Sequence, residues 1–182
     1  GAVMMLVDPQ SKFGMEPFLK TWGIILGGDI VIDPMSKLFG GDFAAPVVNQ
    51  YTVHDITSEF VLATIFPIIQ SVRAIPGSKI ETLELLKTSD NSWGESDFKS
   101  GAVKFDAGSD LKGPVPVAVV STKLLETEKP HSENEEPHEH KEPQPKATLI
   151  VIGDSDFSNN RYSNFSGNGD FFLNTVSWLA EE

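Results

Sequence analysis

Apolar residues fall into two kinds of segment along the chain. Short apolar runs predict strands, and the most continuous of them, at 3–7, 115–121 and 147–152, are typical of strands buried on both faces. The remaining predicted strands are 29–33, 47–53, 64–66 and 79–86. Helical spacing predicts one helix over 11–22 and a final helix begun by Asn168 or Asp170, with Phe172, Val176 and Leu179 on one side.

The order of these elements predicts the class of fold. Apolar strands that alternate with helices favour an α/β domain in three layers, with a mainly parallel sheet flanked by helices. We expect one such domain over residues 1–182. No run of about 18 apolar residues, the length of a membrane span, occurs in the chain. The chain opens directly on the apolar run at 3–7, so we expect it to be a fragment of a longer protein.

One segment, 126–146, differs sharply in composition from the rest. It holds seven Glu, three Lys, three of the four His and four of the twelve Pro, and no aromatic or β-branched apolar residue. Such a segment buries too little apolar surface to offset the entropy lost on ordering. We therefore predict a disordered acidic loop between two strands, because the strand and helix after it are too little for a second domain.

Charge and cysteine content exclude several classes of function. The net charge of -12 argues against binding to nucleic acid, which needs clustered Lys and Arg, and against docking on anionic lipid. The chain has no cysteine, which rules out disulfides, thiolate nucleophiles and zinc-thiolate sites.

The main candidate for chemistry is the sequence Gly-Asp-Ser-Asp at 153–156, directly after a predicted buried strand. Ligands of open α/β sheets bind at the carboxyl edge of the strands. We therefore expect a ligand or partner surface near this edge, formed by Asp154, Ser155, Asp156 and Asn168.

Several chemical interpretations of this sequence compete. Ser155 as a nucleophile would need His54 as its base, and the pattern Gly-x-Ser-x-Gly fails because Phe157 holds its last position. Asp154 and Asp156, with Asp170, could hold Mg²⁺ or Ca²⁺. The chain has no Gly-x-x-x-x-Gly-Lys-Ser/Thr motif, so it is not an ATPase of that class.

The structural interpretation is the one we favour for the same residues. Asp and Ser side chains in loops commonly accept hydrogen bonds from backbone amides two or three residues on. Asp154, Ser155 and Asp156 would then fix the exit from the last strand, and we expect no catalytic residue, no metal and no cofactor.

Two further groups of residues are weaker candidates for a binding site. His131, His138 and His140 could bind Zn²⁺ or Ni²⁺ loosely, although a solvated charge run is the simpler interpretation. A solute- or glycan-binding domain would place aromatic side chains such as Trp93 and Tyr162 in a concave pocket.

Three sequence elements together resemble a known family. The first is Tyr-Thr-Val-His-Asp-Ile-Thr at 51–57, and the second is Leu-Leu-Lys-Thr-Ser-Asp-Asn-Ser-Trp at 85–93. The third and most specific is Val-Ile-Gly-Asp-Ser-Asp-Phe at 151–157, followed by the segment 167–179. These elements are similar to those of the gliding-motility-associated ABC-transporter auxiliary proteins.

The resemblance implies a function and a location. It implies an extracytoplasmic domain held at the bacterial inner membrane by transmembrane helices, acting beside a permease and an ATPase subunit. It also implies a fold of the glutamine-amidotransferase-like class, which an intraflagellar-transport subunit shares, and a non-catalytic role. The loop at 126–146 is not a feature that we associate with the family.

Overall fold

A computed structural model describes residues 1–11, 14–98, 103–125 and 145–180. The helical segments are α1 (Glu16–Thr21), η1 (Pro34–Phe39), η2 (Asp156–Ser158) and α2 (Asn168–Ala180), of which η1 and η2 are 3-10 turns. The first strands are β1 (Ala2–Leu6), β2 (Ile24–Leu26), β3 (Ile30–Ile32), β4 (Val47–Val48), β5 (Gln50–Tyr51) and β6 (Thr64–Ile65). The later strands are β7 (Val72–Ala74), β8 (Glu81–Lys87), β9 (Trp93–Glu95), β10 (Leu111–Lys112), β11 (Pro116–Leu124) and β12 (Lys146–Ile152).

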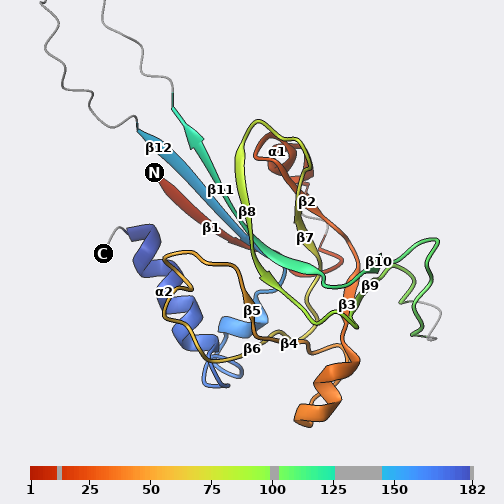
Figure 1. The fold of residues 1–182 in the computed structure, drawn as a ribbon. Coiled ribbons are helices and arrows are strands. Elements are labelled where there is room, and N and C mark those ends of the chain that lie inside the picture. The colour runs from red at the N-terminus through yellow and green to blue at the C-terminus, as the bar shows by residue number, and fades with distance from the viewer. Residues whose placement is uncertain (12–13, 99–102, 126–144, 181–182) are drawn as a thin grey trace, which may run out of the picture.

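The central sheet joins the two ends of the chain (Figure 1). Its order is β1-β12-β11-β8-β5. Only β1 and β12 run parallel, and the β12–β11, β11–β8 and β8–β5 pairs are antiparallel. Three small sheets, β10-β9-β3, β2-β7 and β4-β6, are antiparallel throughout.

Both faces of the central sheet are packed, which explains its uninterrupted apolar runs. Side chains alternate along β12, so Ile150 and Ile152 enter one core while Leu149 and Val151 enter another. The first core lies on the α2 side and holds an aromatic cluster of Phe66, Phe157 and Phe171. The second core contains buried side chains of α1, β2 and β7: Leu19, Ile24 and Val72.

The prediction of a three-layer fold with a mainly parallel sheet flanked by helices is wrong. The sheet is mixed, and the cover on one face is a short helix together with a two-stranded sheet. The physical reason is that an uninterrupted apolar run reports burial on both faces and carries no information on strand direction. Here α2 and the α1–β2–β7 layer bury both faces of strands that pair antiparallel.

Several local predictions also need correction. The run at 3–7 forms β1, but β1 is an edge strand and Val3 is 54 % exposed. The helix expected at 11–22 is reduced to α1, with Met15 rather than Ser11 at its N-cap. In α2 the buried side consists of Asn168, Phe171 and Thr175, while Val176 is exposed.

Other expected features have mixed outcomes. The acidic segment 126–146 lies outside the described residues except for Pro145 and Lys146, and Lys146 begins β12. No helix within the described ranges is long and apolar enough to cross a membrane.

Gly153 marks a close contact between two parts of the backbone. Its N–H donates to the carbonyl of Val117 at 3.0 Å, and its carbonyl accepts from the N–H of Gln70 at 3.0 Å. A Cβ at this position would overlap the carbonyl oxygen of Gln70. Glycine is therefore needed here for close approach of backbone rather than for an unusual dihedral angle.

Gly153→Ala should lower the free energy of unfolding by about 1–3 kcal/mol, because the backbone of Gln70 has to move. Urea unfolding measures the change. The matched control is Gly108→Ala, where a Cβ would meet only the carboxylate of Asp106 at 3.3 Å, and a smaller loss is expected. Equal losses in the two variants would contradict the close contact at Gly153.

Candidate functional site

The carboxyl ends of β1 and β12 meet at one edge of the sheet because these two strands run parallel. The N–H of Val7 donates to the carbonyl of Ile152 at 2.9 Å, one step beyond the paired strands. Asp8 is the second residue after β1, as Asp154 is the second residue after β12. The edge proposed from the sequence therefore gains a third carboxylate, that of Asp8.

Asp154 is the buried member of this group, with 1 % of its surface exposed. Its carboxylate accepts hydrogen bonds from the N–H of Asp156 at 2.9 Å and of Phe157 at 3.0 Å, which starts η2. Burial raises the pKa of Asp154 to about 7; the two amide hydrogen bonds oppose the rise, and the charges of Asp8 and Asp156 add to it. Asp154 therefore caps backbone amides as the sequence favoured, whereas the carboxylate of Asp156, expected to do the same, accepts from the side-chain amide of Asn159 at 2.9 Å.

Ser155 is bound to Asp8 rather than to a base. Its N–H and its hydroxyl donate to the two carboxylate oxygens of Asp8, at 2.7 and 2.8 Å. His54 is engaged elsewhere: its Nδ1 accepts from the N–H of Ile56 at 3.2 Å, and its ring packs edge-on against Trp178, 4.7 Å between centroids. Burial lowers the pKa of His54, and the nearby charge of Asp55 partly opposes this.

Asn168 is a structural clamp, with a fully buried side chain. Its Oδ1 accepts from the N–H of Ile65 at 2.8 Å. Its Nδ2 donates to the carbonyls of Ile65, Phe157 and Tyr162 at 2.9, 3.2 and 3.1 Å. The amide thus ties β6, η2 and the following loop to the start of α2, and no part of it faces solvent.

The four residues expected at a ligand or partner surface therefore separate into two groups. Asp154 and Asn168 are buried and saturated by backbone partners, whereas Ser155 is half-buried and Asp156 is exposed. Asp170, the third residue of the metal hypothesis, is exposed on α2. Among the described residues there is no group of three His, Asp or Glu side chains placed to hold a metal ion.

Sequence reasoning missed two residues at this edge, Asp8 and Gln70. The Gln70 side chain donates to the carbonyls of Val7 and Asp8 at 2.8 and 3.0 Å and accepts from the N–H of Gly28 at 3.2 Å. The signal for Asp8 was present, since it follows the first strand as Asp154 follows the last. Finding it required the knowledge that these strands are parallel neighbours.

The other two family elements also bond internally. In the first, the hydroxyl of Tyr51 donates to the carbonyls of Val48 and Leu62, both at 2.8 Å. In the second, the Thr88 hydroxyl lies 2.6 Å from that of Ser92, and the Ser89 hydroxyl donates to buried Asp33 at 2.7 Å. These side chains fix loops around the sheet.

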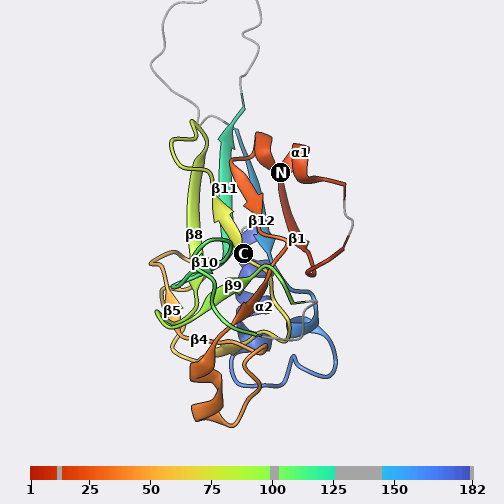
Figure 2. The ribbon, with the colours of Figure 1, turned by 90° about the vertical axis from the view of Figure 1, so that its right-hand side faces the viewer.

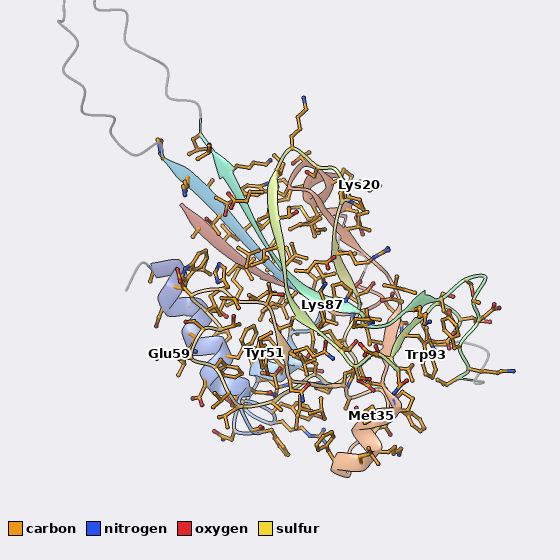
Figure 3. All side chains as sticks on the ribbon, viewed as in Figure 1. Lys20, Met35, Tyr51, Glu59, Lys87 and Trp93 are labelled. Atoms are coloured by element: carbon orange, nitrogen blue, oxygen red, sulfur yellow. The ribbon has the colours of Figure 1, made fainter. Side chains whose placement is uncertain are left out.

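The aromatic side chains proposed for a solute pocket lie in separate ring pairs. Trp93 packs against Phe105 with 6.4 Å between centroids, and Tyr162 packs against Phe165 at 5.9 Å. Figure 3 shows Trp93 on the opposite side of the molecule from α2.

Stability should depend on pH through Asp154. Because its pKa of about 7 in the folded state lies above the ordinary value of 3.8, the folded state binds this proton more tightly. The stabilisation is complete below the ordinary pKa and is lost as the pH rises towards 7. Between about pH 5 and pH 8 the free energy of unfolding should fall by about 2–3 kcal/mol from this group.

Asp154→Asn should remove most of that fall, as measured by urea unfolding at each pH. The control is Asp156→Asn, in which an exposed carboxylate of the same turn is replaced and most of the pH dependence should remain. An unchanged pH profile in Asp154→Asn would contradict the raised pKa.

Comparison with solved structures finds the same fold elsewhere. A structure described as the "mmIFT52 N-terminal domain" aligns with 98 % of this chain and 63 % of its own length, with a TM-score of 0.59 and 14 % sequence identity. This chain thus spans less than two thirds of that protein, and at this identity the likeness concerns the fold alone. The comparison with curated proteins found no match.

The comparison with protein families decides the wider assignment. The sequence pattern of the family described as "ABC-type uncharacterized transport system" matches residues 2–175, which is nearly the whole chain and includes the first two sequence elements and the third as far as residue 175. The auxiliary ABC-transport resemblance drawn from those elements is thereby confirmed, and the chain belongs to this ABC transport-system family.

Proposed function

We propose that this chain is the non-catalytic auxiliary domain through which its transport system assembles, and that it binds the permease subunit, beside the ATPase, on the extracytoplasmic face of a bacterial inner membrane. Transmembrane segments outside this sequence would anchor it, as in the gliding-motility-associated proteins that it resembles. Family membership supports the transport role. An exposed apolar tip, described next, supports binding of a protein partner.

We call Leu38, Phe39, Phe43 and Ile68 the apolar tip. Leu38 and Phe39 are the last two residues of η1. Leu38 is 75 % exposed and Phe39 67 % exposed, and the other two are also exposed. Figures 1 and 2 show η1 projecting from the lower end of the molecule in both views. Leu38 and Phe39 lie on this projection, and exposed apolar side chains on the surface of an acidic domain are typical of a protein interaction site.

The base of the tip is held rigidly, which favours binding. Asp33 is fully buried, and its carboxylate accepts from the N–H of Met35 at 2.9 Å at the start of η1. The same carboxylate accepts the hydroxyl of Ser89 at 2.7 Å, from the second family element. A preformed projection loses little entropy on binding, so more of its contact energy is retained as affinity.

Ile68 adds a second sign of constraint. Its φ of 61° is left-handed, a conformation that costs a β-branched residue about 1–3 kcal/mol. Its N–H donates to the carbonyl of Ala44 at 2.8 Å. This hydrogen bond holds Ile68 beside the segment that contains Phe43. Residues held in strained backbone conformations cluster at functional sites such as ligand clamps and switch regions.

The double variant Leu38→Ser and Phe39→Ser should fold normally, because both side chains are exposed, and should lose at least about ten-fold in affinity for the permease. The measurement is co-purification and titration of the full-length protein with the permease and ATPase of its own system. The control is Val53→Ser with Val61→Ser, two residues that are each 89 % exposed outside the tip. Undiminished binding by the tip variant, or equal loss in the control, would rule out this surface.

Ser155→Ala tests the non-catalytic part of the proposal against the hydrolase alternative. Loss of the hydrogen bond to Asp8 should lower the free energy of unfolding by at most about 1 kcal/mol. Transport by the reconstituted system should be unchanged. Loss of transport by a variant that still folds, with recovery in Ser155→Cys, would instead favour a nucleophilic serine.

A further inference from the structure

Arg73, in the middle of β7, pairs its charge with no residue in the part of the chain that the structure describes. Its neighbour Val72 points into the second core, so Arg73 points to the opposite side of the strand. Its Nε is buried without a hydrogen bond, and no ion pair joins it to any of the described residues. An unsatisfied buried donor costs about 1–3 kcal/mol, so such a group in a native fold calls for an explanation.

The side chain of Arg73 lines a hollow of about 290 Å³. Its lining includes residues of β7, β9 and β10, and these strands lie on the right of the molecule in Figure 1. Its volume is at the lower end of the range for small-molecule sites. Most of its other lining groups are polar: the carboxylates of Asp29 and Asp110 and the hydroxyls of Ser96 and Ser109.

The floor of the hollow is built around a buried carboxylate. Asp29 is 6 % exposed and accepts from the N–H and the hydroxyl of Ser71, both at 2.7 Å. Glycines at 27 and 94 make room for it, because a Cβ on Gly27 or Gly94 would overlap an oxygen of Asp29. A side chain at either position would also reduce the space that the hollow offers.

The rim carries a second fixed carboxylate. Asp110 accepts from the N–H and hydroxyl of Ser96 at 3.0 and 2.8 Å and from the N–H of Asp106 at 2.7 Å. Slight burial acts to raise the pKa of Asp110, but these hydrogen bonds together lower it, so the group is charged at neutral pH. Its Oδ1 already accepts both hydrogen bonds from Ser96, whereas among the described residues its Oδ2 accepts only the one from Asp106 and so has a lone pair left for a ligand.

The charges of the hollow select a class of ligand. A simple anion would be attracted by Arg73 and repelled by Asp29 and Asp110. A simple cation would leave the positive charge of Arg73, which forms no ion pair within the described residues, unmatched. A small molecule with one carboxylate and one ammonium group satisfies both, because guanidinium and carboxylate pair in a bidentate manner.

We propose that this hollow binds a small zwitterion of the free α-amino acid type, with its carboxylate on Arg73 and its ammonium group on the Asp110 side. The site is separate from the apolar tip and does not depend on the proposed binding of a permease. Binding of such a solute would mean that the domain itself recognises a small molecule, in addition to any protein partner.

Calorimetric titration of the full chain with each of the standard amino acids tests the proposal. At least one should bind saturably, and succinate and ethylamine, which each carry one kind of charge, should bind at least about ten-fold more weakly. Arg73→Gln should weaken the binding by at least about ten-fold. The matched control is Arg161→Gln, which replaces the only other arginine of the sequence, an exposed one, and should leave the affinity unchanged.

A second measurement avoids the risk that Arg73→Gln fails to fold. Phenylglyoxal modifies accessible arginines, and mass spectrometry follows Arg73 and Arg161 in the same unaltered sample. The bound amino acid should slow modification of Arg73 and leave Arg161 as an internal reference. The proposal is overturned if no amino acid binds, if succinate binds as tightly, or if both arginines are protected equally.

Discussion

The parallel pairing of β1 with β12 is the contact on which the rest of this structure depends. It joins segments from the two ends of the sequence and brings Asp8 to Ser155, residues that lie 147 positions apart. Because both strands end at the same edge, the turn after β12 can be held from two sides, by its own Asp154 and by Asp8. The turn then leads through η2 to Asn168, which fixes where α2 starts and so which face of the sheet it covers. The residues that make these long-range contacts, from Gly153 to Asn168, lie late in the sequence. They belong to the third sequence element, which is the most specific to the family.

Buried negative charge is handled in one consistent way. Asp29, Asp33 and Asp154 are buried, and each is held by N–H or hydroxyl donors and by no ion pair among the described residues. Each amide hydrogen bond to a carboxylate is strong because the acceptor is charged. Three such carboxylates set the geometry of three loops, so the acidic composition of the chain is partly a structural property. Because none of these carboxylates forms an ion pair with Arg73, the guanidinium of Arg73 remains available to bind a ligand.

The sequence was informative where a property is local, and uninformative where it depends on distant neighbours. Apolar runs located β11 and β12, because burial on both faces leaves a local signature, and the run at 3–7 located β1 although that strand lies at the edge of the sheet. They could not give strand direction, which depends on the order of strands in the sheet, and the predicted parallel sheet was wrong for that reason. The capping role of Asp154 was predictable because its partners lie two and three residues on. The role of Asn168 was not, since its partner Ile65 lies 103 positions away.

The same distinction bears on where function should be sought. Within the three elements that identify the family, four polar side chains are occupied by partners inside the domain: Tyr51, Thr88, Asp154 and Asn168. Leu38, Phe39 and Arg73, by contrast, lie outside those elements and are exposed or unpartnered. A sequence element that builds a scaffold is easy to recognise because many contacts constrain it at once. The groups left free to meet a partner or a solute are constrained by few contacts, so they leave little pattern in one sequence and become visible only when the fold has placed them.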